Sequence, residues 1–189
     1  MRDYVEAIDA LGLVASALEM LQVPYFVTGA LASGIHGEFR ATNDVDIVAA
    51  LTTTHVPAFH ALLGARFLFD LPHAQAAVAN AEMFNIVDLI YFLKIDLIPL
   101  RSAFDQAAAA RAEVTTFAGS DVRARVATRE DILLAKLRWY RLGGEQSDVQ
   151  RRDIARLVEM NRGALDRAYL SRWAVTLGVS DLLARALGS

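Results

Sequence analysis

Three aspartates in two short apolar segments are the residues of this sequence best suited to chemistry. Asp44 and Asp46 alternate with Val45 and Ile47, and side chains two positions apart in an extended chain point to the same face. Neighbouring carboxylates repel each other unless a cation lies between them, and their oxygens favour Mg²⁺ or Mn²⁺. The pair therefore indicates a divalent metal site, with an ordinary pair of surface aspartates as the alternative.

A third carboxylate favours the metal interpretation. Asp96 interrupts a second apolar run, Lys94-Ile95-Asp96-Leu97-Ile98. If the two strands are neighbours, about 4.8 Å apart, Asp96 joins Asp44 and Asp46 on one face. Three carboxylates hold two metal ions about 3.5–4 Å apart, one activating a hydroxyl and one gripping a triphosphate. The pattern predicts a site for two divalent metal ions and a nucleoside triphosphate (NTP).

Strands and helices must position these carboxylates. A short strand at 25–28 leads into Gly29 and a small-residue helix at 30–36, and this turn would offer backbone N–H groups to phosphates. Alternation and period 3.6 predict further elements in the first two thirds of the chain: strands at 45–50, 84–87, 94–99, 114–117 and 122–126, and helices at 4–21, 57–63, 72–81 and 102–110.

The last third of the chain changes character. Thr128-x-x-Asp131 and Ser147-x-x-Gln150 resemble helix-opening capping boxes. They predict helices at 128–142 and 147–160, followed by helices at 165–177 and 181–187. The fold class is therefore α/β (α+β), with a small mixed β-sheet core over residues 1–126, flanking helices, and a C-terminal helical lobe over residues 127–189 packed on the core.

Composition excludes several classes of protein. The 189 residues are 54% hydrophobic and 22% charged, which favours a folded domain over a disordered tail. The absence of cysteine excludes disulfides, thiolate metal sites and a cysteine nucleophile. The most apolar stretch, 83–100, is interrupted by Asp88, Lys94 and Asp96, so no membrane span is expected. The first residues lack the pattern of a signal peptide, and we expect a cytoplasmic protein.

Charge is distributed unevenly along the chain. Residues 1–100 hold four basic and eleven acidic side chains, a balance of −7, whereas residues 101–189 hold fifteen and eleven, a balance of +4. A cation site and an anion site would produce this split. Arginines scattered over helix surfaces would produce it as well. Lysine is rare, because Lys94 and Lys136 are the two lysines of the sequence, and each invites a specific role.

The order of these motifs resembles the polymerase-beta nucleotidyltransferase superfamily. A strand, a glycine turn, a helix, an Asp-x-Asp strand and a later strand with a third Asp follow one another. The form Arg-x-Thr-x-Asp-x-Asp, here from Arg40 to Asp46, is closest to the AbiEii/MenA-like and related uncharacterised bacterial branches. The segment 134–145 and the following Arg152-Asp153-Ile154 resemble the C-terminal helices of such proteins. The resemblance covers about residues 20–160.

The resemblance implies a role for each site residue. Asp44 and Asp46 would be metal ligands, and Asp96 would ligate the catalytic metal and help deprotonate an acceptor hydroxyl. Lys136 would contact the triphosphate, with Asp153 orienting it or capping a neighbouring turn. Arg40 would bind phosphate or brace the aspartate loop. The expected nucleotide-binding residues are Gly29, Ala30, Ser33, Arg40, Lys136 and Asp153.

One position departs from the superfamily pattern. The turn usually reads Gly-Gly or Gly-Ser, whereas Gly29-Ala30 supplies no hydroxyl for a phosphate oxygen. Ser33, one helical turn later, would either replace that hydroxyl or pack within the helix.

Lys136 also stands out without any resemblance. On its expected helix it shares a stripe with Ile132, Leu133, Trp139 and Tyr140, and we expect the two aromatic residues in the core. A lysine in such a stripe must extend to solvent, pair with an acid or serve a ligand.

The implied function is Mg²⁺- or Mn²⁺-dependent transfer of a nucleoside monophosphate (NMP) from an NTP to an acceptor hydroxyl. RNA ends including tRNA, proteins and small molecules all serve as acceptors in this superfamily. The branch includes toxins of bacterial toxin–antitoxin pairs, so a cognate antitoxin protein is a further implied partner. The alternative is a non-catalytic member of the fold that binds a nucleotide or a partner. The complete Asp44, Asp46 and Asp96 set argues against that alternative, and Ala30 argues for it.

Overall fold

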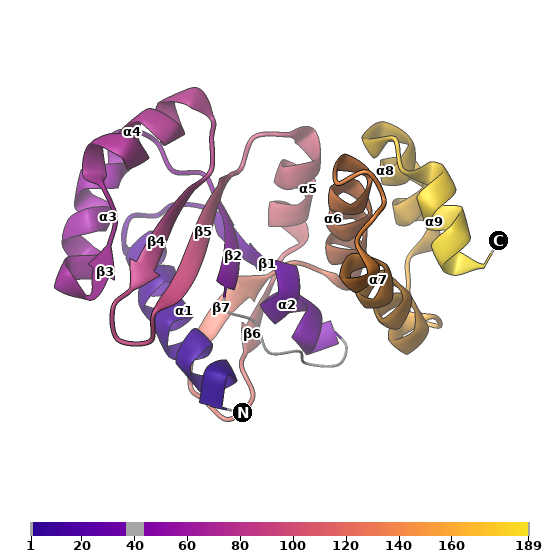
Figure 1. The fold of residues 1–189 in the computed structure, drawn as a ribbon, viewed down its shortest axis with the longest axis horizontal. Helices are drawn as coiled ribbons and strands as arrows, with labels where there is room; N and C mark the ends of the chain where they lie inside the picture. The colour runs from indigo at the N-terminus through magenta and orange to yellow at the C-terminus, as the bar shows by residue number, and fades with distance from the viewer. Residues whose placement is uncertain (1, 37–43, 189) are drawn as a thin grey trace. The chain divides into compact units, whose positions relative to one another are not determined.

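The structure is a computed structural model that describes residues 2–36 and 44–188 (Figure 1). Its strands form one seven-stranded sheet in the order β3-β4-β5-β2-β1-β7-β6. Strand β2 runs parallel to β5 and antiparallel to β1, so the sheet is mixed. The strands are β1 (Tyr25–Thr28), β2 (Asp44–Ala49), β3 (Phe67–Leu68), β4 (Phe84–Asp88), β5 (Leu93–Pro99), β6 (Glu113–Thr116) and β7 (Arg123–Val126).

Helices precede, separate and follow the strands along the chain. The mixed α/β class predicted from the sequence is confirmed. The helices are α1 (Arg2–Met20), α2 (Gly29–His36), α3 (His55–Leu63), α4 (Leu71–Asn80), α5 (Ala103–Arg111), α6 (Arg129–Leu142), α7 (Asp148–Asn161), α8 (Arg167–Leu177) and α9 (Ser180–Leu187), with a short 3-10 helix, η1 (Gly64–Arg66). No helix of the described ranges is long and apolar enough to cross a membrane.

The main core lies against the apolar face of the sheet. Val45, Ile47, Ile86 and Ile95 occupy paired or alternate positions of β2, β4 and β5 and are inaccessible to solvent. Helix α1 packs on β2 and β7, α4 packs on β4, and α3 contacts both helices. Because strand side chains alternate between faces, burying these residues directs Asp44, Asp46 and Asp96 to the opposite face.

An ion network ties α1 to the edge of the sheet. The Arg66 guanidinium donates through Nε and Nη2 to Asp88 Oδ2 at 2.9 and 2.7 Å, and through Nη2 to Asp9 Oδ2 at 2.7 Å. Asp88 is completely buried, and its Oδ1 accepts hydrogen bonds from the backbone N–H groups of Ile90 and Tyr91. This buried carboxylate is stabilised by an opposite charge and by hydrogen bonds, as burial of a charge requires.

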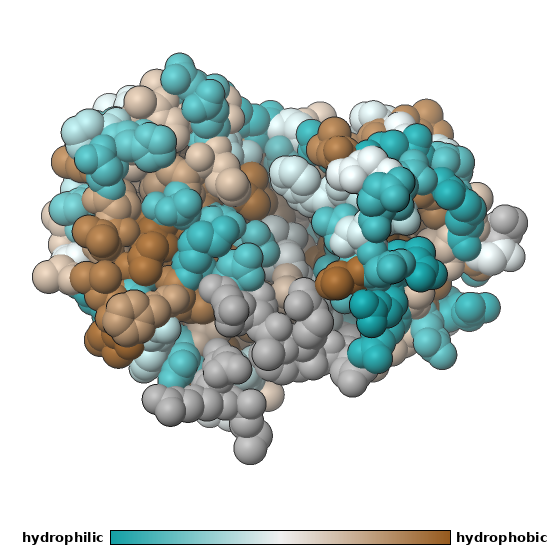
Figure 2. Space-filling model, viewed as in Figure 1, coloured by the Kyte–Doolittle hydropathy of each residue, from teal (hydrophilic) through white to brown (hydrophobic). Residues whose placement is uncertain are grey.

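Apolar side chains are also exposed near this edge. Figure 2 shows hydrophobic residues gathered over β3 and the turn that joins β4 to β5, at the lower left of the view. The exposed residues there are Leu68, Leu89, Ile90 and Phe92.

The chain divides into two compact units. The first comprises Met1–Leu31 and Arg40–Ala127, and the second comprises Ala32–Phe39 and Thr128–Ser189. In the second unit, the Thr128 and Ser147 side chains accept hydrogen bonds from the backbone N–H groups of Asp131 and Gln150. Both helix starts expected from the sequence are therefore present.

Buried polar groups help to hold the second unit together. Asp131, 2% exposed, accepts hydrogen bonds of 2.6 Å from the hydroxyls of Tyr169 and Thr128. Glu130 Oε1 accepts the backbone N–H of Asp166 at the start of α8. These contacts join α6 to α8 around an apolar core that includes Leu133, Leu134, Leu137, Leu157 and Leu170.

Two features differ from the sequence-based expectations. The short elements η1 and β3 were not predicted, because three and two residues are too few for a periodic pattern. The expectation that Trp139 is a core residue was wrong, since its side chain is 55% exposed. Burial along α6 ends at Leu137, and the last turn of the helix faces solvent on that side.

Candidate functional site

A row of four polar residues crosses the middle of the sheet. Asp46 on β2 pairs with Asp96 on β5 and with Thr28 on β1, and Asp96 pairs in turn with Asn85 on β4. Directly paired residues of adjacent strands point to the same face. In the neighbouring row, Asp44 pairs with Lys94. The expected adjacency of the Asp-x-Asp strand and the Asp96 strand is observed, with the three aspartates on one face.

Lys94 brings a positive charge into this group of carboxylates. Its Nζ lies 2.8 Å from Asp96 Oδ2, and the side chain of Lys94 is 44% exposed whereas that of Asp96 is 8% exposed. The hydrogen bond to Asp96 raises the pKa of Lys94 above its usual value, and the charges of Asp44 and Asp46 raise it further. Sequence reasoning marked Lys94 as unusual but did not place it in the site. The signal was its position two residues before Asp96, on the same strand face.

One carboxylate oxygen of Asp96 makes no hydrogen bond within the described chain. This oxygen, Oδ1, is buried. A buried carboxylate oxygen left in this way is costly to the fold. It is therefore a place where a cation or a hydroxyl proton from a ligand would be bound favourably.

Gly29 lies directly against Asp46. It has a positive φ of +68°, and a Cβ built on it would stand 1.8 Å from Asp46 Oδ2. A side chain is excluded both by the backbone conformation and by the carboxylate. The N-terminus of α2 and the aspartate row are therefore adjacent, so a phosphate bound at the N-terminus of α2 would lie near these carboxylates.

The donor set suits a hard divalent cation. Carboxylate oxygens are the ligands that Mg²⁺ and Mn²⁺ prefer, and the buried Asp96 Oδ1 has no hydrogen-bond partner within the described ranges. As they stand, no three His, Cys, Asp or Glu side chains of the described chain form a group that could hold a metal ion. The chemistry of the residues fits the ion, and the assignment of Asp44, Asp46 and Asp96 as its ligands stays a prediction.

The other expected site residues fall into different parts of the chain. Ala30 belongs to the first unit together with Gly29, whereas Ser33, Lys136 and Asp153 belong to the second. Lys136 Nζ lies 3.0 Å from Asp153 Oδ2, with 13% and 21% of the two side chains exposed. This contact is compatible with Asp153 orienting Lys136, and the role of Asp153 stays a prediction. Arg40 lies outside the described residues, and a nucleotide-binding role for any of these residues stays a prediction.

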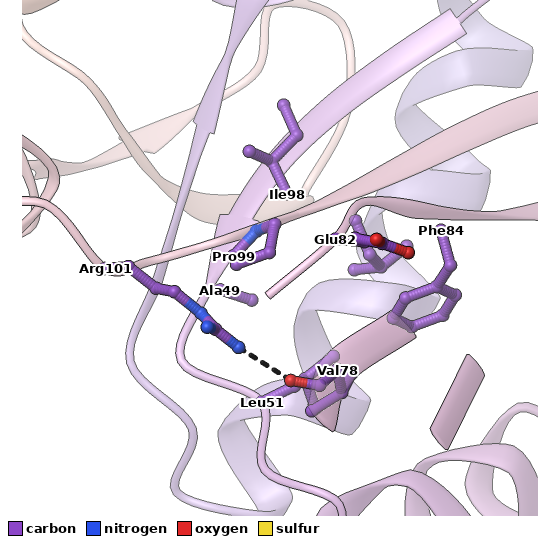
Figure 3. A pocket seen from close by; sticks show the side chains of 9 residues that line it. Ala49, Leu51, Val78, Glu82, Phe84, Ile98, Pro99 and Arg101 are labelled. Atoms are coloured by element: carbon purple, nitrogen blue, oxygen red, sulfur yellow. Dashed lines mark hydrogen bonds between the residues drawn. The ribbon is translucent and has the colours of Figure 1, made fainter. Parts of the chain in front are cut away.

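A separate pocket lies at the other end of the same strands. Figure 3 shows it lined by Ala49 and Pro99, the last residues of β2 and β5, together with Phe84 and Glu82. Arg101 closes one side, where its Nη2 donates to the Val78 carbonyl at 2.7 Å. Asp44 lies at the opposite end of β2, so this pocket is not part of the aspartate site.

Comparison with known sequences finds no match to a family model and none to a curated protein. Comparison with solved structures does find similar folds. The solution structure of the antibiotic-resistance factor ANT(2'')-Ia is 15% identical, covers 91% of this chain and 95% of its own, and has a TM-score of 0.54. The crystal structure of ANT(2'')-Ia in complex with adenylyl-2''-tobramycin is 14% identical, covers 97% and 99%, and has the same TM-score.

A third solved structure is an antigenic nucleotidyltransferase-like protein from Paracoccidioides brasiliensis. It is 15% identical, covers 96% of this chain and 91% of its own, and has a TM-score of 0.49. The two ANT(2'')-Ia structures show that this chain shares their fold over nearly its whole length.

Proposed function

We propose that this protein is a nucleotidyltransferase that moves an NMP from an NTP to an acceptor hydroxyl and releases pyrophosphate. The observation that carries the proposal is the pairing of Asp46 with Asp96 on adjacent parallel strands, with Gly29 against Asp46. The arrangement stands in a fold shared with ANT(2'')-Ia across 97% of this chain. A shared fold alone does not imply a shared activity, so the argument rests on the site.

In the proposed reaction, the acceptor oxygen forms a bond to the α-phosphorus as the bond to pyrophosphate breaks. Asp44, Asp46 and Asp96 would hold Mg²⁺ or Mn²⁺, which supplies charge neutralisation for the polyphosphate when bound. Asp96 Oδ1, which has no hydrogen-bond partner among the described residues, is the group proposed to accept the hydroxyl proton. The N–H groups of the first turn of α2 would hold phosphate oxygens beside Asp46. Lys136 would add a cation at the triphosphate.

A small-molecule hydroxyl is the first acceptor class to test. One similar structure contains adenylyl-2''-tobramycin, a nucleotide joined to an aminoglycoside hydroxyl. RNA ends including tRNA, and protein hydroxyls, are the other acceptor classes. The AbiEii/MenA-like assignment, a toxin role and a cognate antitoxin are finer proposals supported by the sequence motif from Arg40 to Asp46.

The competing proposal is a non-catalytic nucleotide-binding or partner-binding protein of the same fold. Ala30 supports it, because the turn lacks a hydroxyl beside Gly29. The ammonium of Lys94 on Asp96 supports it too, because it already occupies one carboxylate oxygen. Binding of NTP without any transfer, with every acceptor class and both metals, is the result that this proposal expects.

The test is a transfer assay with each α-labelled NTP and either Mg²⁺ or Mn²⁺. Aminoglycosides, total tRNA and a cell protein extract would be supplied in separate reactions, and labelled acceptor and pyrophosphate would both be measured. We expect one acceptor class to be labelled, and we expect Asp46→Asn to abolish labelling while the circular dichroism spectrum stays unchanged. Equal labelling by wild type and Asp46→Asn would contradict the proposal.

A further inference from the structure

We infer that the Lys94 ammonium is a built-in cation that competes with a divalent metal ion for Asp96. This inference rests on the proposed function, because it concerns the same aspartate site. It adds a residue that the motif does not include and a step that must precede binding of a second metal ion. Lys94 must leave Asp96 before both oxygens of that carboxylate are available to a metal ion.

The geometry places the ammonium where a metal ion would bind to Asp96. Lys94 Nζ lies 2.8 Å from Asp96 Oδ2, while Asp96 Oδ1 has no hydrogen-bond partner in the described chain. Strand pairing puts Lys94 directly beside Asp44, and Asp46 directly beside Asp96. An ammonium in contact with Asp96 therefore shares one sheet face with all three carboxylates, and a divalent ion bound there would be repelled by it.

The charges of the three aspartates and Lys94 also indicate that the ammonium competes with a metal ion. Three ionised aspartates and one ammonium leave two negative charges, which a single divalent ion neutralises. A second divalent ion at Asp96 would make the group positive unless Lys94 moves away or a polyphosphate arrives. The nucleotide-free site is therefore built for one divalent ion with Lys94 in place, and a second ion enters when the ammonium leaves.

Lys94 is able to leave, whereas Asp96 is fixed. The lysine side chain is 44% exposed and carries its charge on a flexible four-carbon stem. Asp96 is 8% exposed and lies within a strand paired on both sides. Once released, the ammonium stays on the sheet face where the proposed triphosphate would lie, and it can pair with a phosphate oxygen.

The test measures Mn²⁺ binding to the nucleotide-free protein by electron paramagnetic resonance, so it does not depend on turnover. We expect Lys94→Met to bind Mn²⁺ about tenfold more tightly than wild type, because removing the competing charge frees Asp96. Lys94→Arg keeps the charge and should stay within about twofold of wild type. Arg101→Met removes one positive charge from the far end of the same sheet and should leave the affinity unchanged, which controls for net charge.

Fold integrity is measured on the same samples. Lys94→Gln serves as the second variant if Lys94→Met melts early, and the rise in melting temperature on adding Mn²⁺ should be larger in both variants than in wild type. Equal Mn²⁺ affinity in wild type, Lys94→Met and Lys94→Gln would overturn the inference. The transfer assay tests the proposed function separately. If wild type labels an acceptor while wild type and the Lys94 variants bind Mn²⁺ equally, the role of Lys94 is rejected and the proposed function stands. Absence of both Mn²⁺ binding and transfer removes both proposals.

Discussion

Gly29 and Asp46 constrain each other at the scale of single residues. A Cβ at Gly29 would stand 1.8 Å from Asp46 Oδ2, and the glycine has a left-handed backbone conformation. Gly178 has the same φ of +68° in a left-handed conformation, but nothing in the described chain lies within 4 Å of a Cβ built there. Alanine substitutions at the two glycines therefore separate the free-energy cost of backbone strain from the cost of the clash with Asp46.

We predict that Gly29→Ala destabilises the protein more than Gly178→Ala does. Gly178→Ala should cost about 1–2 kcal/mol of unfolding free energy, the usual cost of a left-handed residue with a side chain. Gly29→Ala should cost about 1–3 kcal/mol more, because Asp46 must move. Urea denaturation of both variants gives the comparison. Equal losses would show that Asp46 moves aside without cost.

The second residue-scale prediction concerns Lys136. Lys136→Ala should weaken NTP binding about tenfold or more, because it removes a cation proposed to contact the triphosphate. Asp153→Asn keeps the ammonium and removes its partner, so it should change NTP affinity less. Isothermal titration with a non-hydrolysable NTP measures both. If both variants melt early and bind the nucleotide normally, the 3.0 Å pair of Lys136 and Asp153 is structural.

At the scale of elements, Arg66 links helix α1, the 3-10 helix and strand β4. We predict that Arg66→Met lowers the unfolding free energy by about 3–5 kcal/mol, because Asp88 would be left charged and completely buried. Adding Asp88→Asn to Arg66→Met should restore part of the loss, since no buried charge remains. Chemical denaturation of the two single variants and the double variant forms a double-mutant cycle. Additive losses in that cycle would contradict the assigned pairing.

Most elements could be predicted because their sequence patterns are local. The alternation of Asp44, Asp46 and Asp96 with apolar residues indicated β2 and β5, and the side chains of Thr128 and Ser147 marked the starts of α6 and α7. The sequence does not show that β2 pairs with β5, because about fifty residues separate the two strands, so this pairing had to be assumed. The contact of Lys94 with Asp96 follows from side-chain geometry that periodicity does not encode.

The misplacement of Trp139 has a similar origin. A helical stripe predicts which residues share a face, but it does not predict how far along the helix a neighbouring element covers that face. On α6 the covered part ends at Leu137, and Trp139 and Leu142 are exposed. The metal ligands and the acceptor could not be predicted further from sequence, since both depend on molecules that bind to the chain.

At the scale of the whole molecule, the excess of basic residues in the range 101–189 suggests where an anionic acceptor would bind. Helix α7 exposes Arg151 and Arg152, and Arg151 already pairs with Asp148 at 3.0 Å. If the acceptor is RNA, the double variant Arg151→Glu/Arg152→Glu should weaken RNA binding and lower the salt dependence by about one to two phosphate contacts. NTP affinity should stay nearly the same.

The control for this prediction is a matched charge reversal on α8. Arg167→Glu/Arg172→Glu changes the net charge by the same amount at two exposed positions of the same unit. Filter binding at several salt concentrations, with NTP titration in parallel, compares the pairs. Equal weakening by both pairs would indicate a general charge effect, and equal loss of NTP and RNA binding would contradict a separate acceptor surface.

The polar row of Thr28, Asp46, Asp96 and Asn85 also guards the chain against misfolding. A slip of one residue between β2 and β5 would turn Lys94 and Asp96 into the apolar face and expel Ile95 and Leu97. Each unpaired ion moved into that interior costs several kcal/mol, so the misaligned sheet is disfavoured. The residues proposed for chemistry thus also fix the register in which β2 and β5 pair. A variant in which all three aspartates become alanine loses this control of register, and hydrogen exchange should reveal weaker protection of the paired strands.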